Sequence, residues 1–195
     1  MNRVCRMENG PTVAGKFPAE ASLSPTETAR FGAALAKRTY SGLLVLLSGD
    51  LGAGKTLLAQ SIGSFLGAEG MRSPTFNIEL IHRLPGRKFS LAHFDLYRLE
   101  SMGHEDIDMP SGPYSGDSDI VMQMEERIED GDLVLVEWGE RWTSPPLSDR
   151  WDVNISRSAG KTRSIELSAF GETALGALAC AYDEILDIAS AVGAG

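Results

Sequence analysis

The feature that most constrains the fold is an apolar run that breaks into a glycine-rich turn and continues as a helical pattern. Residues 43–56 read LLVLLSGDLGAGKT, and apolar side chains then recur at helical spacing as far as Leu66. The run before the turn predicts a buried strand over 43–48, and the spacing after it predicts a helix over 56–66. With the other elements of the chain, this unit predicts an α/β domain, a P-loop NTPase-like mixed β-sheet flanked by helices.

The turn also matches the phosphate-binding pattern G-x-x-x-x-G-K-[ST], known as the P-loop or Walker A motif. Glycines let backbone N–H groups turn toward phosphate oxygens, and the helix N-terminus adds positive potential. Lys55 is expected to reach the β- and γ-phosphates, and the Thr56 hydroxyl to ligate Mg²⁺. The sequence therefore predicts a nucleoside triphosphate site. Its loop residues are Gly49, Asp50, Leu51, Gly52, Ala53, Gly54, Lys55, Thr56 and Leu57.

The rest of the chain predicts one domain over 24–195 after a flexible leader over 1–23. Ser24-Pro25-Thr26-Glu27 matches a capping box with proline at the first helical position. Residues 99–119, rich in Gly, Pro, Ser, Asp and Met, are expected to form a loop or mobile insertion within an acidic segment over 99–132. The remaining patterns predict helices from Ser24 to about Thr39, over 120–128 and over 172–189, and strands over 76–82, 89–95, 133–137, 151–156 and 162–167.

Composition bounds the setting in which this domain works. The 195 residues carry a net charge of −9, but residues 1–99 hold twelve Lys/Arg against seven Asp/Glu, a balance that suits a polyphosphate. Residues 100–132 hold one Arg against eleven acids. Such an acidic segment is either a solvated surface or a surface that faces a partner, and the sequence leaves both interpretations open. The chain is too acidic for a general nucleic-acid binder. It shows no membrane-spanning run and no signal-peptide pattern, so we expect it in the cytoplasm. Cys5 and Cys180 indicate neither a disulfide framework nor a metal site.

Two acids at strand ends are candidates for the chemistry. A P-loop enzyme needs a carboxylate beside its metal, generally at the end of a neighbouring buried strand. Glu137 ends the apolar run LVLVE, and Asp95 ends SLAHFD. Both are predicted to be catalytic, together with Lys55, and to bind the metal, together with Thr56. His93 and the three tryptophans are expected to be packing or interface residues.

Four motifs in order resemble one known family. They are GDLGAGKT (49–56), SPTF (73–76), HFDLYR (93–98) and VEWGER (136–141), and the likeness extends from about Ser24 to Leu167. The set is similar to the bacterial TsaE family, the small ATPases of tRNA threonylcarbamoyladenosine biosynthesis. HFDLYR and VEW are far more specific than the P-loop.

The resemblance implies an ATPase that uses ATP and Mg²⁺ and binds a two-subunit threonylcarbamoyl transferase, of TsaB and TsaD type. It would cycle that partner between turnovers, so contact with tRNA is expected to be indirect. Thr56 and Glu137 would hold Mg²⁺, with Asp95 as a further acid nearby, and Ser73, Pro74 and Thr75 would form a switch segment. Thr28, and either Lys161 or Arg163, resemble positions that approach the nucleotide.

This sequence departs from the family pattern in three places. The stretch over 99–132 is longer and more acidic than usual, the leader is extended, and the C-terminal helix is long. These departures affect the expected partner surface and leave the nucleotide site intact. The residues leave two other functions open. One is a small-molecule kinase, whose lid would be residues 100–132; a lid should carry Arg residues over the phosphates, and this segment holds only Arg127. The other is a nucleotide-dependent binding switch with negligible hydrolysis.

Overall fold

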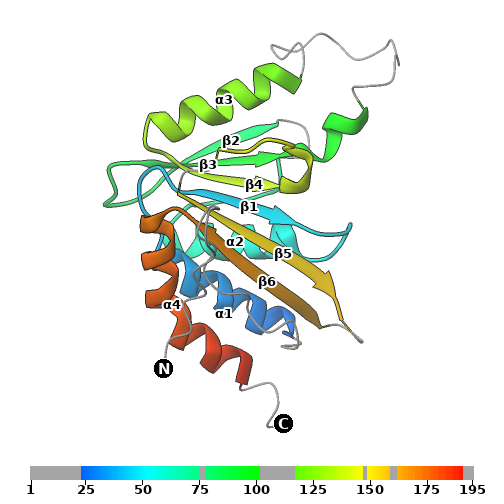
Figure 1. Ribbon diagram of the computed structural model, residues 1–195, viewed down its shortest axis with the longest axis vertical. Coiled ribbons are helices and arrows are strands. Elements are labelled where there is room, and N and C mark those ends of the chain that lie inside the picture. Colours follow the sequence, from blue (N-terminus) through cyan, green and yellow to red (C-terminus); the bar gives the residue numbers. More distant parts are fainter. Residues whose placement is uncertain (1–22, 75–77, 102–116, 147–148, 159–161, 191–195) are drawn as a thin grey trace, which may run out of the picture.

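The protein folds around one six-stranded sheet (Figure 1). The computed structural model describes residues 23–74, 78–101, 117–146, 149–158 and 162–190. Its strands are β1 (Leu44–Ser48), β2 (Glu79–Arg83), β3 (Ser90–Asp95), β4 (Leu133–Glu137), β5 (Arg150–Arg157) and β6 (Arg163–Phe170). Its helices are α1 (Pro25–Ala36), α2 (Lys55–Leu66), α3 (Asp117–Glu129) and α4 (Glu172–Ser190), with 3₁₀ turns η1 (Leu96–Ser101) and η2 (Gly139–Arg141).

Sheet order explains where a site can form. The strands lie in the order β2-β3-β4-β1-β5-β6. The four central strands are parallel, while β2 and β6 run antiparallel to their neighbours β3 and β5. The expected mixed sheet flanked by helices in a single domain is therefore confirmed. In such a sheet the carboxyl ends of the parallel strands share one edge, where ligands bind.

Helices cover the two faces of the sheet unequally. Helices α1, α2 and α4 pack on one face, and their apolar side chains form the larger core with alternate residues of all the strands except β2. Helix α3 covers β3, β4 and β1 on the other face through Ile120 and Met124 (Figure 1). Strand β4 is buried along its whole length, which agrees with the continuous apolar run LVLVE.

Local sequence signals place several element boundaries. The Ser24 hydroxyl accepts the Glu27 N–H at 3.3 Å, and the Glu27 carboxylate accepts the Ser24 N–H at 2.7 Å, so the predicted capping box is present. Helix α1 ends at Ala36, three residues before the expected Thr39. The leader prediction is wrong at its last residue, because Leu23 is buried and pairs with Arg163 through two backbone hydrogen bonds. Residues 1–22 lie outside the described chain.

The acidic segment contains more regular structure than its composition indicates. The expectation of a loop over 99–119 is wrong at both ends, since η1 continues to Ser101 and α3 begins at Asp117. Apolar contacts of α3 with β4 outweigh the poor helix propensity of its first residues. Residues 102–116 are outside the described chain. Across the described ranges, no helix has the length and hydropathy needed to cross a membrane.

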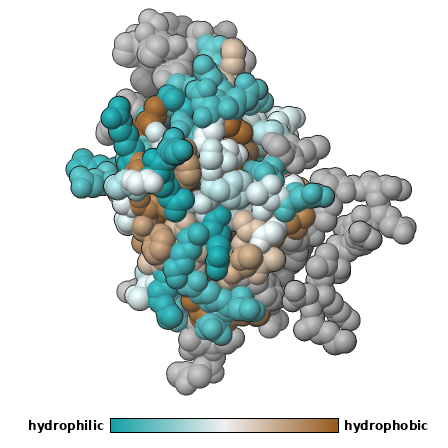
Figure 2. Space-filling view, turned by 90° about the vertical axis from the view of Figure 1, so that its left-hand side faces the viewer, coloured by the Kyte–Doolittle hydropathy of each residue, from teal (hydrophilic) through white to brown (hydrophobic). Residues whose placement is uncertain are grey.

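The edge at which the parallel strands begin lies opposite the phosphate-loop end. Figure 2 views the molecule from that side, and polar side chains with scattered apolar ones cover it. The described loops at this edge include the β2–β3 turn, with exposed Pro85, Gly86 and Lys88. The glycine-rich loop follows the last residue of β1, and the two carboxylates predicted as catalytic are the last residues of β3 and β4, so the candidate site lies at the other edge.

Candidate functional site

The glycine-rich loop connects the end of β1 to the start of α2, as the sequence predicts. Gly49 has φ 133°, and a side chain there would collide with the Ile155 carbonyl oxygen of β5. Gly54, the residue before α2, has φ 116°. Both positions therefore require glycine, because other residues seldom adopt these angles and Gly49 has no room for a Cβ. The loop wraps the N-terminus of α2, where free backbone N–H groups favour an anion.

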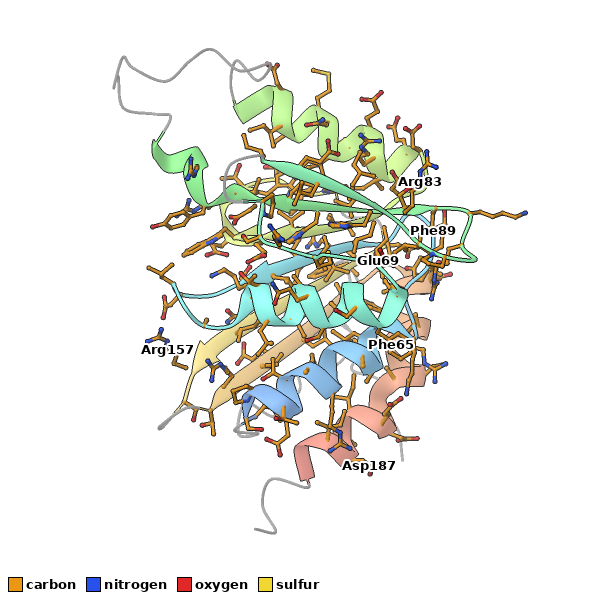
Figure 3. All side chains as sticks on the ribbon, turned by 180° about the vertical axis from the view of Figure 1, so that it is seen from behind. Phe65, Glu69, Arg83, Phe89, Arg157 and Asp187 are labelled. Atoms are coloured by element: carbon orange, nitrogen blue, oxygen red, sulfur yellow. The ribbon has the colours of Figure 1, made fainter. Side chains whose placement is uncertain are left out.

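Two arginines of the β5–β6 hairpin hold the carbonyl groups of this loop. Arg157 donates through Nε to the Gly52 carbonyl at 3.4 Å and through an Nη to the Leu51 carbonyl at 3.2 Å. Arg163, which is paired with Arg157 across the two strands, donates to the Ala53 carbonyl at 3.1 Å. Figure 3 shows Arg157 at the end of β5 beside the loop. In a trans peptide the C=O of one residue and the N–H of the following residue point to opposite sides. Because the arginines bind the C=O groups, the N–H groups of the same peptides point away from the arginines.

Lys55 is folded back onto its own loop. Its amine donates to the Gly49 carbonyl and, at 3.0 Å, to the Asp50 carbonyl. The same amine lies 3.5 Å from the centre of the Trp138 ring, a cation–π contact. Burial lowers the pKa of Lys55, while the carboxylates of Glu140, Glu137, Asp95 and Asp50 act in the opposite direction. The lysine is thus a buried donor among carbonyl groups that a phosphate would replace.

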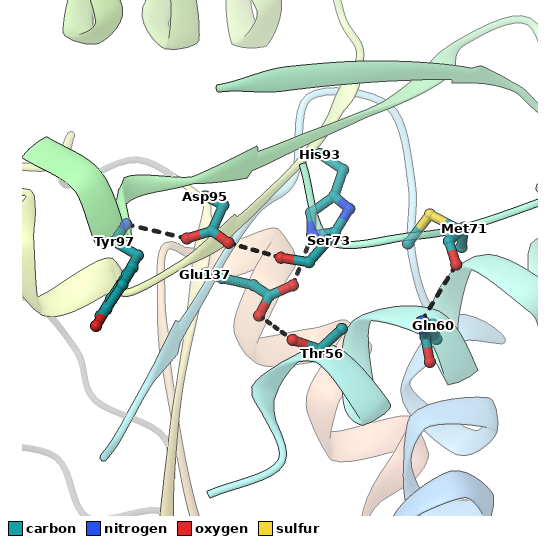
Figure 4. Close-up of polar contacts among 8 residues, drawn as sticks. All are labelled: Thr56, Gln60, Met71, Ser73, His93, Asp95, Tyr97 and Glu137. Carbon is teal, nitrogen blue, oxygen red and sulfur yellow. Dashed lines mark hydrogen bonds and ion pairs between the residues drawn. The ribbon is translucent and has the colours of Figure 1, made fainter. Parts of the chain in front are cut away.

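Glu137 and Thr56 meet at the centre of the site (Figure 4). The Thr56 hydroxyl donates to Glu137 Oε2 at 2.6 Å, although the two residues are 81 positions apart. They meet because β4 lies beside β1 in parallel register, with Glu137 opposite Leu47, the residue before the last of β1. The Glu137 side chain is only 2% exposed, so it is not a surface acid at a strand end.

Asp95 lies next to Glu137 in the register of β3 and β4. Its carboxylate accepts the Ser73 hydroxyl at 2.6 Å and the Tyr97 N–H at 3.0 Å. The structure therefore brings the start of the SPTF segment to the second predicted acid (Figure 4). Pro74, next in that segment, is buried, and Thr75 lies outside the described residues.

Two aromatic residues near the acids take part in ways the sequence did not predict. Imidazole Nε2 of His93 is 3.0 Å from Glu137 Oε1, and both side chains are almost fully buried. Trp138 has φ 62° and, besides Lys55, contacts the Arg141 guanidinium at 4.6 Å and the Tyr97 ring at 4.9 Å. His93 does pack in the interior as expected, but the hydrogen bond to Glu137 was missed. The alternation in H-x-D, which puts His93 and Asp95 on one face, is the signal that could have found it.

The two residues predicted to approach the nucleotide base remain predictions. Thr28 is fully buried in α1, where its hydroxyl donates to the Ser24 carbonyl at 2.9 Å. Lys161 lies outside the described residues. Arg163, the alternative to Lys161, contacts the loop carbonyl already described.

The donor set at the end of the sheet fits a magnesium ion shared with phosphates. Thr56, Glu137 and Asp95 offer hydroxyl and carboxylate oxygens, which are the donors that Mg²⁺ prefers. Within the described ranges, no group of three or more His, Cys, Asp and Glu side chains could enclose a metal ion. Mg²⁺ usually takes one or two carboxylates and completes its shell with water and substrate phosphates, so two acids beside a phosphate loop are sufficient.

Comparison with known proteins points to one family. The model of the family described as threonylcarbamoyl adenosine biosynthesis protein TsaE matches residues 22–165. The tRNA threonylcarbamoyladenosine biosynthesis protein TsaE of Streptomyces coelicolor is 36% identical over 146 residues, which cover 72% of this chain and 89% of that protein. The protein of the same name from Rickettsia prowazekii is 36% identical over 129 residues, covering 64% and 78%.

A solved structure supports the fold independently. The crystal structure of YdiB from Bacillus subtilis superposes with a TM-score of 0.54, covering 87% of this chain and 91% of that one. The sequences are 22% identical, so this likeness concerns the fold alone. The stretch matched by the family model contains the whole glycine-rich loop, Asp95 and Glu137.

Proposed function

The chain belongs to the TsaE family of threonylcarbamoyl adenosine biosynthesis proteins, and we propose that it is the Mg²⁺-dependent ATPase of that pathway. In this proposal it binds a threonylcarbamoyl transferase made of TsaB- and TsaD-type subunits. ATP binding and hydrolysis reset the transferase between rounds of modification at position 37 of tRNA. The protein itself transfers no group to tRNA and contacts tRNA only through the complex.

The observation that carries the ATPase proposal is the contact of Thr56 with Glu137 at 2.6 Å. It joins the start of the phosphate loop's helix to a buried carboxylate on the neighbouring strand. This is the pairing by which P-loop NTPases hold their metal. When bound, Mg²⁺ neutralises charge on the β- and γ-phosphates. Thr56, Glu137 and Asp95 would hold it.

The remaining site residues have roles that follow from their contacts. The Lys55 amine leaves the Gly49 and Asp50 carbonyls and donates to the transferring phosphoryl group, where it stabilises negative charge. Loop amides orient the phosphates. Ser73 exchanges its hydrogen bond with Asp95 for one that depends on the γ-phosphate, so the segment over 73–75 reports the nucleotide state.

Exposed apolar side chains beside the site suit a partner that senses this state. Leu51, at the tip of the phosphate loop, is 69% exposed, and Tyr97, two residues after Asp95, is 45% exposed. Both flank residues that change contacts when the nucleotide changes. A partner seated on them would couple its own conformation to hydrolysis.

The proposal is tested by hydrolysis and by reconstitution. We expect ATP hydrolysis that the transferase stimulates, and multi-turnover threonylcarbamoylation that stops when this chain is left out. Glu137→Ala should still bind ATP but hydrolyse it at least about a hundredfold more slowly. Glu125→Ala, at an exposed acid on α3, is the control and should hydrolyse normally. Undiminished turnover in the Glu137 variant would remove that residue from the mechanism.

The same measurements separate the two other functions. Arg127, the single basic residue of 100–132, is bound to Glu79 at 2.8 Å and lies 3.8 Å from Asp132, so its position gives a kinase lid no support. Phosphoryl transfer to a metabolite would revive the kinase. Nucleotide-dependent binding to the transferase without phosphate release would instead identify a binding switch.

A further inference from the structure

A buried histidine holds the carboxylate that the proposed function assigns to the metal. Nε2 of His93 and Oε1 of Glu137 are 3.0 Å apart, and their side chains are 0% and 2% exposed. The other carboxylate oxygen, Oε2, accepts the Thr56 hydroxyl. Each oxygen of Glu137 therefore has its own donor, one from β3 and one from α2 (Figure 4).

The register of the sheet produces this contact. His93 pairs with Leu135, and Asp95 pairs with Glu137, along the parallel strands β3 and β4. Side chains two residues apart on a strand share a face, so all four lie on the face covered by α2. His93 is then the diagonal neighbour of Glu137, within reach of a long side chain. The spacing H-x-D on one strand and the strand-end acid on the next are sufficient to build the pair.

The chemistry of the pair fixes how the carboxylate is presented. An ionised carboxylate only accepts hydrogen bonds, so Nε2 carries the proton and donates it. A buried carboxylate oxygen that loses its donor suffers a large desolvation cost, which it can avoid only by rotating toward another donor. Nδ1 of His93 has no hydrogen-bond partner within the described part of the chain, so Glu137 is the contact that orients this ring.

We infer that His93 is a positioning residue that, by holding Oε1 of Glu137, keeps Oε2 directed at Thr56 and the magnesium site. This inference rests on the proposed function and extends it to a residue that touches neither nucleotide nor metal. Removing a residue that hydrogen-bonds to a metal ligand generally lowers metal affinity about 10- to 100-fold.

The test compares two replacements of His93. Gln places a side-chain N–H near the position of Nε2, whereas Leu fills similar space without a donor. The quantity measured is the gain in ATP affinity that saturating Mg²⁺ produces at equilibrium, with ATP affinity in EDTA as the reference. We expect His93→Leu to reduce this gain about tenfold or more while leaving the affinity in EDTA unchanged. His93→Gln should recover most of the gain.

His82 provides the matched control. It faces the same side of the sheet from β2, where it pairs with Leu91, and its Nε2 is likewise buried. No carboxylate contact of His82 occurs among the described residues. His82→Leu should therefore leave the magnesium-dependent gain as in the wild type. An equal loss in this variant would show that the effect is general to histidines on this face of the sheet, and would overturn the inference.

A double-mutant cycle shows whether His93 acts through Glu137. In a Glu137→Ala background, His93→Leu should cause no further loss of the magnesium-dependent gain. Three outcomes would each overturn the positioning role. They are a full additional loss in the Glu137→Ala background, an unchanged magnesium-dependent gain in His93→Leu alone, and a gain in His93→Gln as small as that in His93→Leu. If the wild type itself shows no magnesium-dependent ATP binding, the proposed function fails. If the wild type binds and His93→Leu matches it, only the inference about His93 fails.

Discussion

At the scale of single residues, Lys55 is the side chain whose contacts most depend on the ligand. Its amine now satisfies two loop carbonyls and lies on Trp138, and a bound phosphate competes for all three contacts. We expect Lys55→Ala to weaken ATP binding by about 2 kcal/mol, close to thirtyfold, because a hydrogen bond from a charged group is lost. Isothermal titration of ATP with Mg²⁺ measures this.

A second lysine distinguishes a local effect from a general loss of charge. Lys37, the residue after α1, is half exposed and forms an ion pair with Glu184 of α4 at 2.6 Å. Lys37→Ala should bind ATP as the wild type does, since an exposed pair contributes little. ATP affinity that falls equally in both variants would show that net charge, and not the position of Lys55, decides binding.

At the scale of elements, the β5–β6 hairpin acts as a support for the phosphate loop. Arg157 and Arg163 donate to three consecutive loop carbonyls from neighbouring strands. We expect Arg157→Ala to lower ATP affinity about fivefold, or about 1 kcal/mol, because the loop loses its order before binding. The double variant with Arg163→Ala should lose more. The maximal rate at saturating ATP should stay near that of the wild type, which steady-state kinetics measures.

The control for the hairpin lies on the opposite edge strand. Arg83 is exposed at the end of β2, far along the sheet from β5. Arg83→Ala should change neither the Michaelis constant nor the maximal rate. If Arg157→Ala lowers the maximal rate without changing the Michaelis constant, the hairpin arginines act on the chemical step and the support role is wrong.

The elements also show what the sequence could predict. The strand–loop–helix unit, the capping box and Glu137 after LVLVE followed from local patterns, because hydrophobic periodicity and turn chemistry act over a few residues. The arginine contacts of the loop and the His93–Glu137 bond join residues 44 or more positions apart. They depend on strand order, which the sequence alone left undetermined. Helix α3 begins at Asp117, three residues before the predicted start, and its apolar pattern begins only at Ile120.

At the scale of the whole molecule, strand order gathers the site from distant parts of the chain. β1, β3 and β4 end at one edge, so the phosphate loop, Asp95 and Glu137 meet although β2, η1 and α3 lie between them in sequence. The site therefore exists only in the folded chain. A ligand that binds there stabilises the folded state against the unfolded state by RT ln(1 + [L]/Kd).

This linkage predicts a change in thermal stability. With ATP and Mg²⁺ at one hundred times the dissociation constant, the free energy of unfolding should rise by about 2.7 kcal/mol. For a domain of this size that corresponds to a rise of about 5–10 °C in the melting temperature, measured by differential scanning calorimetry. Lys55→Ala at the same ligand concentration should show a much smaller rise, because the site is no longer saturated. Arg83→Ala should rise as the wild type does. A wild-type protein whose melting temperature does not respond to ATP and Mg²⁺ would contradict nucleotide binding at this edge of the sheet.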